Sequence, residues 1–214
     1  MPSKLSVYNG ALQALGERKL RSLAEACKAR RELDSVWDGD TGVQFCLQQA
    51  IWNFALNTIS LTYSPSVTPP DGFPYTYAFD KPTDWVRTAV VSDDGSFCNL
   101  PFDFADQGAY WFANPDTIWV KYVSKGATFG LDPSLWTPNF TAYVEHHFAA
   151  KACKSITGSN TDKEQLEVKV KRLLSQARVT DAIDEAPQFI PPGTWSRSRR
   201  GGRARSDRGS ATEL

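Results

Sequence analysis

The sequence predicts an α+β fold: an antiparallel helical bundle with a small antiparallel β insertion and an extended C-terminal arm. Apolar residues recur at intervals of three and four near both ends of the chain, as in amphipathic helices. The middle is rich in aromatic and β-branched residues, which is typical of strands. We therefore place bundle helices at 1–60 and 132–186, the β insertion at 61–131, and the arm at 187–214.

Two helices are expected before residue 60. Leu5, Tyr8 and Leu12 form one apolar stripe, and Gly16 is well placed to end that helix. The capping-box pattern at 22–25 predicts the start of a second helix. Its apolar stripe is renewed over 43–54, so we expect one long helix to about residue 59, with Gly39 as the place where it would kink.

The periodicity changes after Tyr63. Residues 64–74 contain four prolines and one glycine, which indicates a loop. Strands are expected at 75–79 and 85–92, and the turn signal Asp93-Asp94-Gly95 predicts a hairpin that returns over 97–100. A second hairpin is expected from 109–113 to 117–123 around Asn114-Pro115-Asp116.

Helical periodicity returns near residue 137. Thr137 followed by Pro138 is typical of a helix N-terminus, and the apolar stripe runs from Phe140 to Ala152. Gly158 is expected to end this helix. A capping-box pattern at 161–164 then predicts a last helix to about residue 185, whose stripe at 166, 170, 173 and 177 suits a bundle or a subunit interface.

The net charge is zero, with 24 basic and 24 acidic residues, which excludes a globally basic nucleic-acid binder. The charges are unevenly distributed, because residues 195–214 hold six Arg against Asp207 and Glu213. This segment is therefore +4 and the preceding residues are −4. We expect no membrane span and no signal peptide, since no apolar run approaches the length either needs. The four cysteines lack CxxC spacing and are expected to be reduced; they are Cys27, Cys46, Cys98 and Cys153.

We predict no catalytic residue, no cofactor and no metal site. His146 and His147 are adjacent, so on a helix they point about 100° apart and do not readily share a metal. Four aspartates in the β insertion raise the alternative of a carboxylate metal site in a metal-dependent hydrolase, although Asp is also an ordinary turn residue; they are Asp93, Asp94, Asp103 and Asp106. The sequence contains no GxSxG, Walker A or GxGxxG pattern.

The arm combines apolar anchors with arginines. Such a segment binds nucleic acid through phosphate contacts, or inserts into a groove on a partner protein, or remains a solvated tail. Trp195 argues against the solvated tail, since an idle tail gains nothing from an exposed Trp. The candidate docking residues are Phe189, Ile190, Trp195, Arg197, Arg199, Arg200, Arg203, Arg205 and Arg208.

The β insertion is unusually rich in Trp and Tyr. Most of these side chains are expected in the core, and some are candidates for a subunit or tail interface, where amphipathic aromatic residues are favoured. The candidates are Trp85, Tyr110, Trp111, Trp119 and Tyr122.

Several segments resemble the head-to-tail adaptor (connector) proteins of tailed bacteriophages, the tail tubular protein A-like family. The resemblance spans almost the whole chain and rests on a pattern of segments rather than one motif. The segments are 7–18 (VYNGALQALGER), 32–37 (ELDSVW), 45–54 (FCLQQAIWNF), 75–87 (YTYAFDKPTDWVR), 109–112 (AYWF), 119–123 (WVKYV) and 191–197 (PPGTWSR) with the arginines that follow.

The resemblance implies a structural virion protein at the head-tail junction, made in the bacterial host cytoplasm and not an enzyme. Such adaptors form a ring, usually of twelve copies, between the portal protein and a tail or nozzle protein. The arm would dock on the portal, and ordering it would cost about 1–2 kcal/mol per residue. The chain would be a monomer in isolation and assemble on the portal.

DNA would pass through the ring lumen without specific binding, which a neutral or acidic lumen favours. The acidic candidates for the lumen are Glu164, Glu167, Asp181, Asp184 and Glu185. The alternative function is nucleic-acid binding through the Arg-rich arm.

Overall fold

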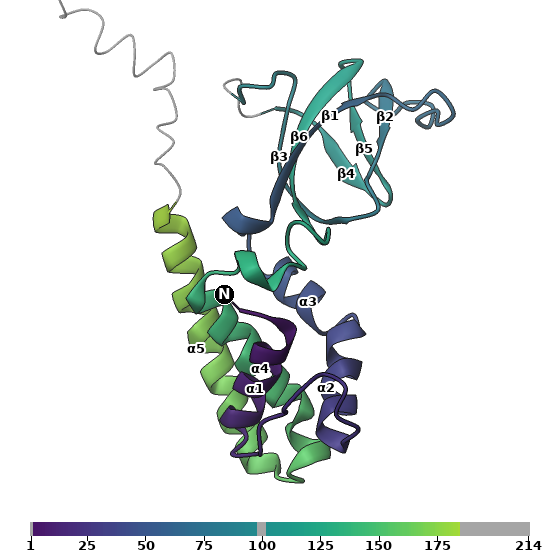
Figure 1. The fold of residues 1–214 in the computed structure, drawn as a ribbon. Helices are drawn as coiled ribbons and strands as arrows, with labels where there is room; N and C mark the ends of the chain where they lie inside the picture. The colour runs from purple at the N-terminus through teal and green to yellow at the C-terminus, as the bar shows by residue number, and fades with distance from the viewer. Residues whose placement is uncertain (1, 98–101, 185–214) are drawn as a thin grey trace, which may run out of the picture. The chain divides into compact units, whose positions relative to one another are not determined.

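The computed structural model describes residues 2–97 and 102–184 (Figure 1). Contacts group residues 1–184 into one unit and 185–214 into a second, so the predicted arm lies outside the described residues. The helices are α1 (Lys4–Ala14), α2 (Lys28–Asp38), α3 (Val43–Gln48), α4 (Pro138–Ile156) and α5 (Asn160–Asp184), with short 3₁₀ turns η1 (Asn53–Ala55) and η2 (Pro133–Leu135). The strands are β1 (Leu56–Thr62), β2 (Tyr77–Asp80), β3 (Trp85–Ser92), β4 (Ala105–Gln107), β5 (Tyr110–Ala113) and β6 (Thr117–Ser124).

The predicted fold class is wrong in its architecture. Within the described residues, five helices accompany two three-stranded antiparallel sheets that share a core of their own. The chain is therefore not a helical bundle with a small β insertion. It consists of a helical part and a β part, each with its own apolar core. The prediction failed because it gave residues 56–59 to a helix, whereas they begin β1 and pair with β6.

The helical part is built around α4. Helices α1, α2 and α5 all contact α4, and Figure 1 shows α4 and α5 running side by side. Thr137 caps α4, accepting a hydrogen bond from the Phe140 backbone N–H at 3.4 Å, as predicted. Within this core Phe140 packs against Trp52 and Trp136, with ring centroids 4.7 and 5.2 Å apart.

The predicted long second helix is broken into two. Helix α2 ends at Asp38 and α3 begins at Val43, with Gly39 and Gly42 at the ends that face each other. A Cβ on Gly42 would lie 2.0 Å from the Val36 carbonyl oxygen, so only glycine permits this approach of backbone to backbone. The glycines do not kink a helix here but end it.

The last helix begins slightly earlier than predicted. It starts at Asn160, and the Ser159 hydroxyl accepts a hydrogen bond from the Asp162 N–H at 3.2 Å. Ser159 therefore caps the helix in place of Thr161. Gly158 has a φ of +74°, which explains why a glycine ends α4. None of the described helices is both long and apolar enough to cross a membrane.

The strands pair differently from the predicted hairpins. One sheet has the order β1-β6-β3 and the other β2-β5-β4, all antiparallel. The consecutive strands β5 and β6 therefore belong to different sheets. The two sheets share a core that includes Phe79, Trp111 and Ile118. The predicted return strand at 97–100 is outside the described residues after Phe97, which is not in a strand.

The helical and β parts are joined by a small set of specific contacts. The Asp181 carboxylate, on α5, accepts hydrogen bonds from the Asn53 backbone N–H at 3.2 Å, just before β1. Arg178 donates to the Gln49 carbonyl, and Arg87 on β3 donates to the Gln48 carbonyl at 3.2 Å. The end of α5 therefore holds the segment that leads from α3 into the β part.

Candidate functional site

Helices α3, α4 and α5 enclose a groove of about 370 Å³. Phe45, Val170 and Leu174 contribute its apolar surface, and Lys151, Lys163 and Lys171 also line it. We call it the lysine-rimmed groove; it is lined by Phe45, Gln49, Tyr143, His147, Ala150, Lys151, Lys163, Glu167, Val170, Lys171 and Leu174. The single carboxylate, Glu167, lies 3.7 Å from the Lys163 ammonium, so the rim is positive overall.

The two adjacent histidines have separate hydrogen-bond partners. The Nε2 atom of His147 lies 2.7 Å from the Thr41 carbonyl oxygen, and Nδ1 of His146 lies 2.8 Å from the Ala142 carbonyl oxygen. Burial lowers the pKa of both imidazoles, so both are neutral near pH 7. His147 also stacks on Phe45 at 5.2 Å and thereby supports one wall of the groove.

The groove has no activated nucleophile among the described residues. Cys46 lies behind Tyr143 and is fully buried, and burial raises the pKa of its thiol to about 12. Such a thiol stays protonated and unreactive at neutral pH. Cys27 and Cys153 are free thiols, and Cys98 lies outside the described residues. Cys46 is therefore no candidate nucleophile for the groove.

Helix α5 is apolar on two opposite faces. Leu166, Val170 and Ala177 face the core. On the other side Val168, Val179 and Ile183 are 69%, 58% and 75% exposed, whereas the other exposed large hydrophobic residues within 2–97 and 102–184 reach at most 45%. We call these three residues the α5 ridge. The sequence analysis predicted only the core-facing stripe. The second set is also visible in the sequence, because Val168, Val179 and Ile183 are spaced by 11 and 4 residues and therefore lie on one helical face.

In the β part, a lysine is buried between two tryptophans. The Lys81 ammonium pairs with Asp106 and lies 4.1 Å from the centre of the Trp85 ring, and its side chain is 6% exposed. Asp106 also accepts a hydrogen bond from Thr88 at 2.6 Å and from the Trp111 indole at 3.2 Å. Burial alone would raise the pKa of Asp106, but the bonds from Lys81 and Thr88 outweigh it and lower that pKa.

A second polar cluster in the β part is centred on Tyr122 of β6. The Tyr122 hydroxyl donates to the Asp84 carboxylate at 3.1 Å and accepts from the Asn57 amide at 3.0 Å. Burial and the negative charge of Asp84 raise the pKa of Tyr122 to about 12. Both clusters are satisfied within the chain. The first joins the loop after β2 to β3 and β4, which belong to different sheets, and the second joins the loop before β3 to β1 and β6, so we assign them a structural role.

The four aspartates considered as a metal site do not converge. Asp106 pairs with Lys81, Asp103 accepts a hydrogen bond from Tyr75 at 2.8 Å, and Asp94 accepts one from Ser96 at 2.8 Å. Asp93 lies beside Ser92. Within residues 2–97 and 102–184, no group of three or more His, Cys, Asp or Glu is placed to hold a metal ion.

The five aromatic candidates for an interface divide into two groups. Trp111 and Tyr122 are essentially fully buried in the β core. Trp85, Tyr110 and Trp119 are only partly buried, so the interface prediction rests on these three.

The acidic candidates for a lumen also divide. Asp181 is buried against Asn53, whereas Glu164, Glu167 and Asp184 are exposed. Glu185 lies outside the described residues, as do all the candidate docking residues of the arm, from Phe189 to Arg208.

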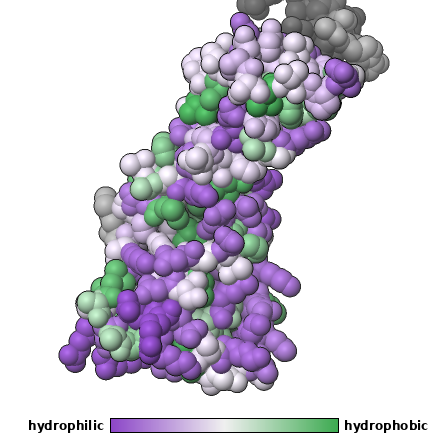
Figure 2. All heavy atoms as spheres, turned by 90° about the vertical axis from the view of Figure 1, so that its right-hand side faces the viewer, coloured by the Kyte–Doolittle hydropathy of each residue, from purple (hydrophilic) through white to green (hydrophobic). Residues whose placement is uncertain are grey.

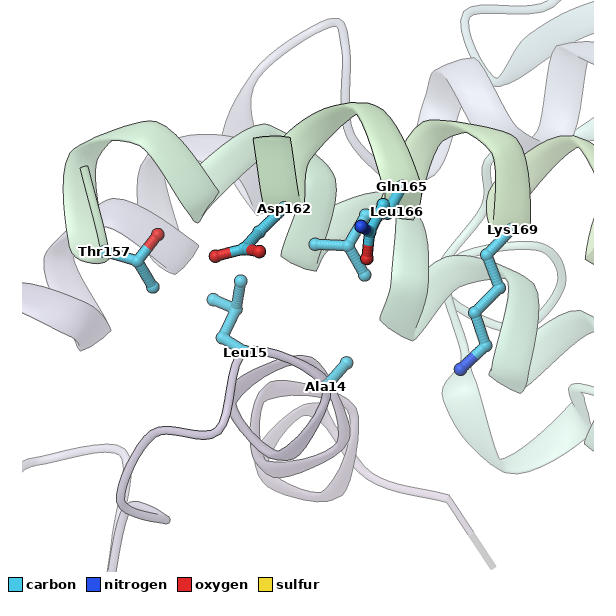
Figure 3. Close-up of a pocket in the computed structure, with 7 residues that line it drawn as sticks. All are labelled: Ala14, Leu15, Thr157, Asp162, Gln165, Leu166 and Lys169. Carbon is cyan, nitrogen blue, oxygen red and sulfur yellow. The ribbon is translucent and has the colours of Figure 1, made fainter. Parts of the chain in front are cut away.

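A smaller pocket of about 250 Å³ lies between the end of α1 and the start of α5. Figure 3 shows the Asp162 carboxylate pointing toward Leu15, with Lys169 further along α5. On the face in Figure 2, hydrophilic side chains predominate over the helical part and hydrophobic ones form small separate patches. The smaller pocket has little apolar surface, so the lysine-rimmed groove is the better candidate for binding a partner.

No protein-family profile matches the chain. One similar protein is the glycogen synthase of Pasteurella multocida, 34% identical over an 82-residue alignment that covers 32% of this chain. Another is the ESAT-6-like protein EsxH of Mycolicibacterium smegmatis, 32% identical over 66 residues and 31% of this chain. The chain spans 16% and 62% of the length of these curated relatives, so neither assigns it to a family.

Proposed function

We propose that the chain is a structural virion protein of a tailed bacteriophage, an adaptor whose copies form a ring between the portal protein and the tail. The proposal rests on the segments that resemble this family. The observation that carries its assembly role is the α5 ridge, three strongly exposed apolar side chains on a helix already packed into the core through its other face. Val179 and Ile183 lie one helical turn apart and form an exposed apolar pair, whereas Arg172 and Ser175 separate them from Val168 on the same face. An exposed apolar pair on a helix that is already packed through its other face suits a contact with a neighbouring copy.

The charge of residues 1–184 supports an assembly role for this part of the chain, so the nucleic-acid alternative rests on the Arg-rich arm alone. Residues 1–184 carry 18 basic and 21 acidic side chains, because six arginines and only three acidic residues lie beyond. Residues 56–132 alone contain nine Asp and four basic residues. Such a surface repels phosphate, which suits a wall along which DNA slides without being held.

Electron microscopy of the full chain mixed with portal rings tests this function. We expect a ring of density beneath the portal, with other copies of the chain as neighbours and a free face for the tail protein. No association with the portal would overturn the proposal. Tight binding of free duplex DNA, weakening steeply with salt, would instead favour the nucleic-acid alternative.

The role of the arm is tested separately by a shortened chain that ends at Ala186. If residues 187–214 dock on the portal, this chain forms no density there. A stable ring formed by the shortened chain would show that the arm is not required.

A further inference from the structure

The lysine-rimmed groove has the shape of a binding site for one more helix. Helices α4 and α5 contact each other and are joined by residues 157–159, so they run antiparallel. The side chains that α5 contributes to the groove recur at positions 163, 167, 170 and 174, and those of α4 at 143, 147 and 150. Intervals of three and four residues place each set on one side of its helix, as in the seam between packed helices.

The groove is long enough for about three turns of an occupant helix. From Lys163 to Leu174 the wall formed by α5 extends about 16 Å, at 1.5 Å per residue. Helix α3 has only six residues and reaches the groove through Phe45 and through Gln49, which follows the helix. Phe45 is 37% exposed, and Val170 and Leu174 are half-buried, so these apolar side chains are accessible to an occupant.

The two walls of the groove each carry a positive charge that no acidic group offsets among the described residues. Lys151 comes from α4 and Lys171 from α5, and neither forms an ion pair there, whereas Lys163 pairs with Glu167 at 3.7 Å. The Lys151 ammonium lies 6.0 Å from the centre of the Phe45 ring, so a carboxylate bound to it would bring its own apolar neighbours onto that ring. The groove therefore matches a helix whose apolar side is flanked by carboxylates.

Residues 1–184 as a whole do not attract an acidic peptide. They carry 18 basic and 21 acidic side chains, a net charge of −3. Attraction of an acidic helix to this part of the chain therefore depends on the local charge of the groove, and a basic or uncharged helix lacks that attraction.

We propose that the lysine-rimmed groove binds an amphipathic acidic helix of a different protein. The apolar side of that helix packs on Phe45, Val170 and Leu174, and its flanking carboxylates pair with Lys151 and Lys171. An apolar groove that takes one side of an amphipathic helix is a recurrent mode of peptide recognition. The inference goes beyond the adaptor function and does not depend on it, because it stands on the geometry and charge of the groove.

Fluorescence anisotropy of the full chain with a labelled synthetic peptide tests the site. The acidic probe is about 15 residues long, the length at which an isolated helix becomes marginally stable, with leucines at intervals of three and four and glutamates on both flanks. A scrambled peptide of the same composition has the same charge but no apolar side, so it measures any attraction to the Arg-rich arm. We expect one-to-one binding of the acidic probe, at least about tenfold tighter than that of the scrambled peptide.

Reversing the charge of the groove should reverse its preference. In the groove variant, Lys151→Glu with Lys171→Glu, both positions are exposed, and the acidic probe should bind at least about tenfold more weakly. The matched control, Lys154→Glu with Lys169→Glu, changes the charge equally at exposed positions outside the groove and should bind the probe like the unmodified chain. A third peptide, with lysines in place of the glutamates, should bind the groove variant more tightly than the control, a gain that misfolding cannot produce.

Two results would overturn the site: equal binding of the acidic probe and the scrambled peptide, or equal binding of the acidic probe by the groove variant and the control. The portal experiment separates this inference from the proposed function. If a ring forms beneath the portal but the chain does not prefer the acidic probe, the groove inference is wrong and the adaptor function stands. If the probe binds as expected but the chain never associates with the portal, the adaptor function is wrong and the groove inference stands.

Discussion

The helical and β parts of this protein are stabilised in different ways. In the helical part, a large apolar core gathers around α4, with aromatic rings such as Trp52, Phe140 and Phe148 fully buried. In the β part a smaller core is supplemented by polar clusters, in which Lys81 and Asp84, from the loop between β2 and β3, pair with Asp106 on β4 and Tyr122 on β6. The helical part therefore relies mainly on the packing of apolar side chains, with one polar cluster of Tyr8, Arg30 and Asp34 between α1 and α2, whereas the smaller β core relies more on such clusters.

The largest expected effect comes from removing a central ring of the helical core. Phe140→Ala should lower the free energy of unfolding by about 3–5 kcal/mol, because it leaves a cavity among Trp52, Phe54 and Trp136. Urea denaturation measures the loss. The exposed Val168→Ala is the control and should change stability by less than about 0.5 kcal/mol. A comparable loss in both variants would contradict this picture of the core.

Gly42→Ala tests the break between α2 and α3 by the sign of its effect. In one continuous helix, Ala in place of Gly would stabilise by about 1 kcal/mol. In the observed break, the new Cβ would meet the Val36 carbonyl, so we expect a loss of about 1–3 kcal/mol. Thermal unfolding gives the sign directly, and Gly72→Ala, which lies in a loop at positive φ, is a separate control for strain alone.

Lys81→Met tests whether the β part depends on its polar cluster. Methionine keeps the apolar stem beside Trp85 but leaves Asp106 without its cation, so we expect a loss of about 1–2 kcal/mol after allowing for partial exposure of Asp106. The double variant Lys81→Met with Asp106→Asn removes both charges and should recover part of the loss. No difference between the single and double variants would show that the charge pair is unimportant.

The smallest expected effects are on pH dependence, and they separate the two parts. Burial depresses the pKa of His147 below the ordinary 6.5, so the stability it contributes is present above pH 6.5 and is lost as the pH falls through its lower folded-state pKa. The pKa of Asp106 is likewise depressed below 3.8, so its contribution is lost only when the pH falls below that value. Stability should therefore decline in two steps, the first from the helical part.

Melting temperatures between pH 8 and pH 5 check the first step. His147→Gln should make the decline that begins below pH 6.5 shallower, with the remainder due to His146, whose pKa burial also lowers, whereas Asp106→Asn should leave that decline unchanged. A decline of the same slope in the unmodified chain and in His147→Gln would show that this histidine does not cause it.

Much of the local structure could be predicted from the sequence, because its causes lie within a few residues. The first and last helices, the N-cap at Thr137, the end at Gly158 and most strand positions follow from apolar spacing and turn chemistry. The candidate site was harder to predict from the sequence. The groove forms only when residues from α3, α4 and α5 meet. The burial of Lys81 could not be predicted either, because its partners Trp85, Asp106 and Trp111 lie 4 to 30 residues further along the chain.

The sequence by itself determined the first and last two helices, four of the six strands that the structure describes, and the charge contrast between residues 1–194 and the C-terminal segment. Only the tertiary structure decided that β1 leaves the helical region to pair with β6, and that β5 and β6 enter different sheets. It also decided that the described residues leave Val168, Val179 and Ile183 on α5 exposed. The physical reason is that a side chain's spacing along the chain fixes its face, whereas what covers that face depends on long-range packing.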